Sequence, residues 1–109
     1  MSQMTIPLPV LDAAAREFLK RNDAEKEFQT VCALVRECFP QLLKLEAELK
    51  DDHDEPGRQL LVVYAHVSES GYGPEYREQV VRYHDRFVDE VPLSKVPLFV
   101  MQNRFVQEE

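Results

Sequence analysis

The fold is decided by residues 43–67, which read LKLEAELKDDHDEPGRQLLVVYAHV. In the first eight residues apolar and charged side chains alternate, and this period of two predicts a strand with one buried face and one wet face. The inward residues are Leu43, Leu45, Ala47 and Leu49, and the outward residues are Lys44, Glu46, Glu48 and Lys50. Residues 51–57 are turn sequence. Residues 59–67 are apolar at almost every position, which predicts a central strand and hence a long-looped β-hairpin.

Two helices are predicted before this hairpin. Apolar residues at helical spacing predict the first over 12–21 and the second up to Phe39, where Pro40 ends it. Asn22, followed by Glu25 three residues later, is close to a capping box and predicts a break at 22. A continuous helix over 12–39 stays the alternative, because neither Gly nor Pro interrupts that stretch.

A third helix and a third strand are predicted after the hairpin. Residues 68–73 are loop sequence, and Pro74 suits the first position of a helix that Pro92 ends. Its inward stripe is Tyr76, Val80, Tyr83, Phe87 and Val91. Residues 97–106 follow as a strand, and the crossover makes it parallel to the central strand. The prediction is one α+β domain over 1–109, in the order ααββαβ, with a three-stranded mixed sheet packed on helices and residues 1–10 as an extended arm.

Composition restricts the function. Twenty acidic against 13 basic residues give a net charge of −7, which disfavours binding to nucleic acid. No run of 18 apolar residues and no signal-like leader is present, so we expect a cytoplasmic protein without membrane contact. Cys32 and Cys38 would lie about 9 Å apart along one helix, beyond disulfide reach. They are therefore predicted to be reduced thiols in the core.

Two loop motifs allow a functional and a structural interpretation. Acidic residues surround His53 in the hairpin loop, but neighbours in a loop rarely converge on one ion, so we interpret the loop as a solvated turn without a metal. The loop 68–73 before Pro74 is similar in outline to a phosphate loop. It lacks a third glycine and a following Lys-Ser/Thr, and Glu69 and Glu75 would repel an anion. We interpret it as a flexible connection and predict no cofactor.

One ligand-binding hypothesis remains. His66, Tyr72, Tyr76 and His84 fall near the carboxyl end of the central strand, where open α/β sheets usually bind ligands. A His beside a Tyr or a carboxylate can do acid–base work. The alternative is an aromatic stripe that packs the helix onto the sheet, with the histidines at its rim. No catalytic residue is assigned.

The stretch from Leu42 to Val91 resembles a type of short, uncharacterised bacterial α+β protein. The resemblance lies in LKLEAEL, an acidic Pro-Gly turn, QLLVVYAHV and RYHDRFVDEV. It implies a bacterial, cytoplasmic origin and no particular chemistry.

The leading hypothesis is a non-enzymatic interaction or regulatory domain of adaptor or antitoxin type. Strand 97–106 has Arg104 as its only charge, so its apolar faces predict a protein partner or a homodimer formed through this strand. The second hypothesis is a small enzyme or ligand-binding protein that uses the His/Tyr pocket.

Overall fold

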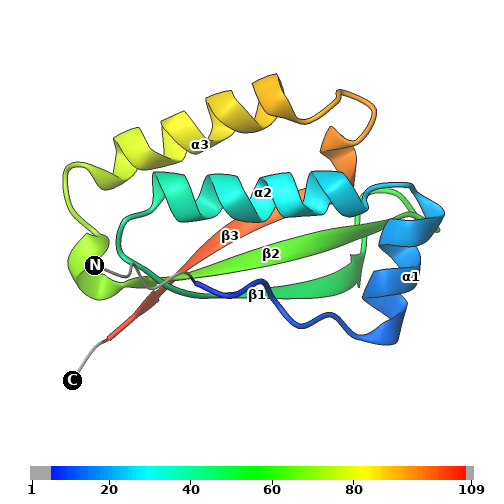
Figure 1. The fold of residues 1–109 in the computed structure, drawn as a ribbon, viewed down its shortest axis with the longest axis horizontal. Coiled ribbons are helices and arrows are strands. Elements are labelled where there is room, and N and C mark those ends of the chain that lie inside the picture. Colours follow the sequence, from blue (N-terminus) through cyan, green and yellow to red (C-terminus); the bar gives the residue numbers. More distant parts are fainter. Residues whose placement is uncertain (1–5, 108–109) are drawn as a thin grey trace.

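The computed structural model describes residues 6–107 and confirms the predicted order of elements (Figure 1). Two one-turn 3₁₀ helices, η1 (Glu69–Gly71) and η2 (Val96–Leu98), are added to that order. The main elements are α1 (Ala13–Arg21), α2 (Glu25–Cys38), β1 (Leu42–Asp51), β2 (Gln59–Ser68), α3 (Tyr76–Glu90) and β3 (Phe99–Val106).

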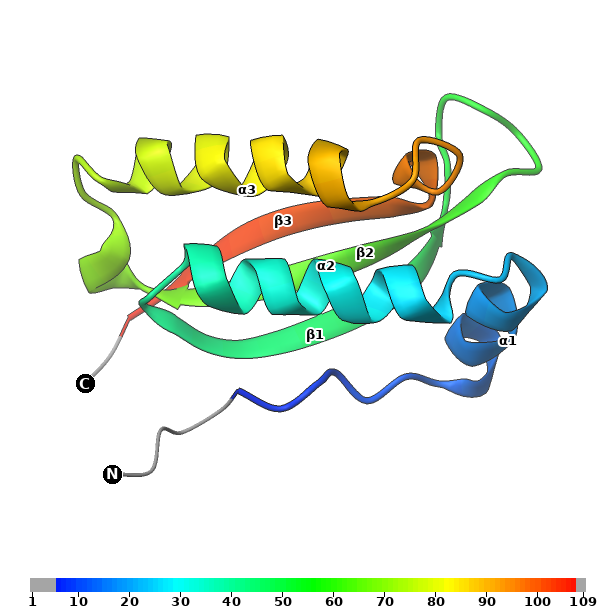
Figure 2. The same ribbon diagram turned by 45° about the horizontal axis from the view of Figure 1, so that its top comes forward.

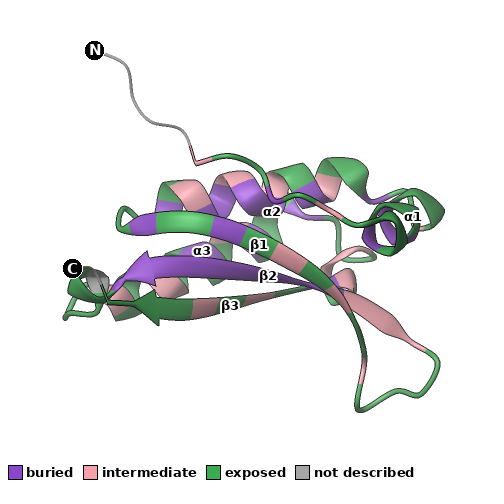
Figure 3. Cartoon of the chain, turned by 90° about the horizontal axis from the view of Figure 1, so that it is seen from below, coloured by how far each residue is buried: buried purple, intermediate pink, exposed green. Residues whose placement is uncertain are grey.

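The three strands form one mixed sheet in the order β1-β2-β3. β1 is antiparallel to β2, whereas β3 is parallel to β2, as the crossover through α3 predicts. Helices α2 and α3 cover one face of the sheet, with α3 lying along β3 (Figure 2). The other face carries no helix (Figure 3). β2 is thus the central strand, and β1 and β3 are the two edges.

The core lies between the helices and the covered face of the sheet. β2 contributes its alternate residues Leu61, Val63, Ala65 and Val67, all completely buried. Both cysteines of α2 are buried in the same core and free. Burial raises the pKa of Cys32 to about 12, although the nearby Arg36 charge lowers it slightly. The prediction of buried thiols is therefore confirmed.

The break between the two N-terminal helices is confirmed, and a continuous helix over 12–39 is wrong. The predicted role of Asn22 is also wrong, because Asn22 ends α1 and does not begin α2. Its side-chain nitrogen donates a hydrogen bond to the carbonyl of Phe18 at 2.8 Å. Asp23 then adopts a φ of 51°, in the left-handed region that Asp tolerates better than most residues. α2 starts after Ala24 without a side-chain cap.

The first residues of β1 differ from the predicted alternation. Leu42 is 8% exposed and belongs to the core, whereas Leu43, which was predicted to point inward, is 40% exposed. The pairing of β1 with β2 shifts between Leu42 and Lys44. Such a bulge inserts one extra residue and reverses which side chains face the core before it. From Leu45 onward the predicted facing is confirmed.

Two predicted boundaries move by two residues. α3 begins at Tyr76, so Pro74 precedes the helix and does not form its first position. β3 begins at Phe99, because Pro97 and Leu98 belong to η2. A proline cannot donate the backbone hydrogen bond that a strand requires, which explains the later start of β3.

The described helices are short. α2 has 14 residues and α3 has 15, whereas a bilayer-spanning helix needs about 20 apolar residues. Within residues 6–107, no helix has both the length and the apolar character to cross a membrane.

Candidate functional site

The four predicted ligand-binding residues lie on different sides of the molecule. His66 points from β2 to the uncovered face of the sheet, where its Nε2 lies 2.5 Å from Glu46 Oε1 on β1. Tyr72 and Tyr76 contact Phe105, which lies on the helix-covered side of β3. His84 is on an exposed part of α3, edge-on to Tyr83. The structure thus brings Tyr72 and Tyr76 together, but does not bring the histidines to them.

The tyrosines form an aromatic cluster at the end of β3. Ring centroids are 4.9 Å apart for Tyr72 and Phe105, 5.0 Å for Tyr76 and Phe105, and 5.5 Å for the two tyrosines. Phe39 of the core adds a fourth ring, 6.3 Å from Tyr76. Burial raises the pKa of Tyr76, with a smaller contribution from Tyr72. The cluster packs the start of α3 onto β3.

His66 belongs instead to a row of polar contacts on the uncovered face. Next to the His66–Glu46 contact, the Tyr64 hydroxyl donates a hydrogen bond to Glu48 Oε1 at 3.2 Å. The guanidinium of Arg104 lies 4.0 Å from the centroid of the Tyr64 ring. Each aromatic or imidazole group on β2 therefore has a charged partner on a neighbouring strand.

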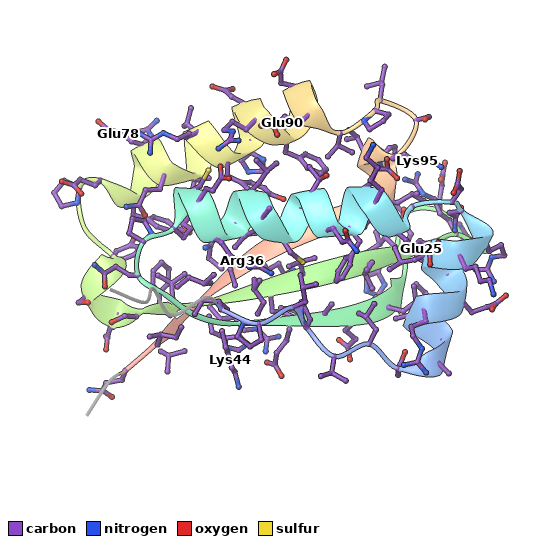
Figure 4. All side chains as sticks on the ribbon, in the orientation of Figure 1. Glu25, Arg36, Lys44, Glu78, Glu90 and Lys95 are labelled. Carbon is purple, nitrogen blue, oxygen red and sulfur yellow. The ribbon has the colours of Figure 1, made fainter. Side chains whose placement is uncertain are left out.

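Lysines complete this row on β1. Lys44 lies 4.0 Å from Glu46, and Lys50 lies 3.5 Å from Glu48. Lys44 projects away from the helices, at the lower edge of the molecule in Figure 4. Each of the two glutamates thus has a lysine of this chain beside it. A shallow recess of about 410 Å³ lies along the row, lined by Asp12, Glu46, Ala47, Glu48, Tyr64 and Arg104.

The sequence did not point to Glu46, Tyr64, Glu48 or Arg104 as partners of this face. Alternation places Glu46 and Glu48 on one face of β1, but it does not say which residues of β2 they meet. That depends on the register of the hairpin, which the long loop leaves open.

The hairpin loop itself is held by Arg58. Its guanidinium contacts Glu55 at 2.9 Å and Asp52 at 3.8 Å, and it donates to the carbonyl of Pro97. Gly57 takes a φ of 86°, a conformation that glycine adopts without strain. Among the described residues, no group of three or more His, Cys, Asp or Glu side chains is placed to hold a metal ion.

A different kind of site lies at the outer edge of β3. β3 pairs with β2, and within residues 6–107 no strand pairs with its other side. Three of its apolar side chains are between 37% and 38% exposed, namely Val100, Phe105 and Val106. The edge therefore presents unpaired backbone groups between apolar side chains.

The flank of α3 continues this apolar edge. At 100° per residue, Val81, His84 and Val88 point to one side of α3. The opposite side faces α2, since Arg86 pairs with Glu37 of α2. Val81 is 52% and Val88 61% exposed. We call six residues on the two sides of this edge the β3 surface. Phe105, Val81, His84 and Val88 lie on the helix side, and Val100 and Val106 lie on the uncovered side.

The β1 edge is guarded, in contrast to the β3 edge. The extended residues 6–12 run along the β1 side of the molecule (Figure 2). Ile6 and Leu11 pack against the core, and Pro9 is buried. The bulge after Leu42 further disturbs this edge. A covering segment and a β-bulge are both typical protections of an edge strand against unwanted strand pairing.

Comparisons of the chain with protein families, with curated proteins and with solved structures find no match. Function is therefore inferred from the chain's own surfaces.

Proposed function

We propose that this protein is a non-enzymatic interaction domain that binds an extended segment of a partner protein as a fourth strand at β3. The observation that carries the proposal is the unpaired edge of β3 beside the exposed apolar flank of α3. In strand addition, backbone hydrogen bonds supply affinity, and pockets for alternate side chains supply specificity. A regulatory role of adaptor or antitoxin type is compatible with this mode of binding.

The difference between the two edges supports the proposal. Sheets usually protect edge strands with charges, bulges, prolines or covering segments. β1 has a covering segment, a bulge and four charged side chains on one face. β3 has a single charge, Arg104, among eight residues. An edge left open in a sheet whose other edge is guarded is a candidate for a specific contact.

The position of α3 favours a partner segment over a second copy. α3 lies along β3 at the edge of the sheet (Figure 2). If two copies joined their β3 strands into one continuous sheet with all helices on the same face, each would bring its own α3. Neighbouring strands lie about 4.8 Å apart, but packed helices need about 8–10 Å. A single added strand has no helix to accommodate. The homodimer predicted from the sequence stays a prediction.

The acid–base alternative has less support. His66 and the two tyrosines of the hypothesis lie on opposite sides of the sheet. On the uncovered face, His66 Nε2 and the Tyr64 hydroxyl are already engaged by glutamates.

A cytoplasmic location is part of the proposal and fits two free thiols in the core.

The experiment uses a fluorescent peptide of eight residues, alternating valine and threonine, between solubilising ends. We expect the chain to bind it and to raise its fluorescence anisotropy. Val100→Lys places a charge at the β3 edge and should weaken binding at least tenfold. Leu43→Lys is the matched control, because Leu43 is equally exposed on the other edge strand. Equal loss in both variants, or no binding at millimolar protein, would reject the proposal.

Light scattering tests the homodimer directly. We expect a monomer without peptide. A dimer that Val100→Lys dissociates would instead show that a second copy occupies β3.

A further inference from the structure

We infer that the segment bound at β3 carries an acidic side chain opposite Arg104, on the uncovered face of the sheet. This inference rests on the proposed strand addition and specifies the chemistry of the partner. It is carried by the geometry of Arg104 and by the charges around it.

Arg104 is held in place at the outermost strand. Its guanidinium carbon lies 4.0 Å from the centroid of the Tyr64 ring, a cation–π distance. Tyr64 is itself 5% exposed and fixed by its hydrogen bond to Glu48. A guanidinium stacked on a ring keeps the N–H groups along its rim free for other partners. Arg104 is therefore a positioned donor and not a freely moving surface side chain.

Arg104 has no carboxylate partner in the described part of the chain. The ion pairs between residues 6–107 engage Lys44, Lys50, Arg58, His66 and Arg86. Glu46, two strands away, contacts His66 and Lys44, and Glu48 contacts Tyr64 and Lys50. Asp12, the third carboxylate that lines the recess beside Arg104, accepts a hydrogen bond from the Ala15 backbone amide at 2.8 Å. The three carboxylates of the recess are thus already engaged, whereas the rim of the Arg104 guanidinium is not.

An added strand would place one of its side chains directly opposite Arg104. Side chains directly opposite on neighbouring strands have Cβ atoms about 5 Å apart, which suits an ion pair and disfavours two like charges. The side chains before and after Arg104 on the same face are Gln102 and Val106, which are neutral. A carboxylate can accept two parallel hydrogen bonds from a guanidinium, which makes the pair directional.

The net charge of −7 opposes an acidic partner only weakly at this position. At physiological salt, charges more than about 8 Å apart are largely screened. β3 contributes only Arg104 as a charge, and the carboxylates of the recess beside it already have other partners. An acidic side chain on the added strand would therefore meet a cation that has no ion-pair partner among residues 6–107.

The test uses the valine–threonine peptide with one threonine at a time replaced by glutamate or by lysine. At one position, we expect the glutamate peptide to bind three- to tenfold more tightly than its lysine counterpart. Arg104→Glu should reverse this preference. Arg82→Glu, an exposed arginine on α3, makes the same change in net charge and should leave the preference unchanged. Melting curves check that both variants are folded.

Two results would overturn the inference. If glutamate and lysine peptides bind equally well, or if Arg104→Glu keeps the preference for glutamate, the acidic partner is wrong while strand addition stands. If none of the peptides binds, the proposed function fails and the inference fails with it.

Discussion

Replacing Leu42 or Leu43 by alanine tests the bulge at the start of β1. Leu42 is 8% exposed and packs in the core, whereas Leu43 is 40% exposed. Buried leucines lose about 2–5 kcal/mol on replacement by alanine, through lost burial and the cavity left behind. We expect about 3 kcal/mol for Leu42→Ala and under about 1 kcal/mol for Leu43→Ala. For a domain of this size, about 3 kcal/mol lowers the melting temperature by about 12 °C or more.

Urea denaturation followed by circular dichroism measures these losses. Leu45→Ala is the reference, because Leu45 is buried both in the structure and in a regular alternation. Leu42→Ala should resemble it, and Leu43→Ala should resemble the wild type. If Leu43→Ala costs as much as Leu45→Ala while Leu42→Ala is nearly neutral, the strand is regular and the bulge is wrong.

Further predictions concern the core. Burial raises the pKa of the Cys32 thiol from 9.0 to about 12. Cys32 should therefore react slowly with a bulky maleimide until urea is added, and rapid labelling of the folded chain would contradict this. The unfolded chain releases the Cys32 thiol proton at a lower pH than the folded chain does, so the free energy of unfolding should fall as pH rises from 9 toward 12. The fall should be smaller in Cys32→Ala. Identical pH profiles of the two proteins would argue against a raised pKa of Cys32. Leu45→Asp should unfold the domain, since an unpaired buried carboxylate costs several kcal/mol, about as much as the whole stability. Glu46→Lys removes the exposed partner of His66 and Lys44 and should cost only about 1 kcal/mol. Equal melting temperatures of the two variants would refute the facing of β1. Asn103→Val should raise stability by about 1 kcal/mol, because the buried Asn103 amide nitrogen has no hydrogen-bond partner among the described residues. A loss of stability would indicate that this nitrogen does have a hydrogen-bond partner.

The architecture could be predicted from the sequence because each element has a clear period. The continuous apolar run of β2 identified the central strand, and the crossover through α3 made β3 parallel to it. The facing of single residues and the ends of the helices were harder to predict from the sequence. Leu42 and Leu43 are the same residue type, so nothing local tells which one faces the core. Asn22 suits either end of a helix, and the structure uses it at the end of α1.

The candidate site could be predicted only in part. The apolar character and the single charge of strand 97–106 pointed to its edge. The exposed flank of α3 beside that edge could not be predicted, because it depends on which side of α3 faces α2. The partners of His66 were also hidden, because the hairpin register depends on a loop that Arg58 ties to Pro97, 39 residues later in the chain.

The central claim is that β3 accepts a fourth strand. The most direct measurement is nuclear magnetic resonance of the isotope-labelled chain titrated with the valine–threonine peptide. We expect the backbone amides of residues 99–106 to shift and become protected from exchange, with close contacts between peptide protons and β3 protons. Perturbation of residues 42–51 instead, or no perturbation of β3 at saturating peptide, would contradict the claim.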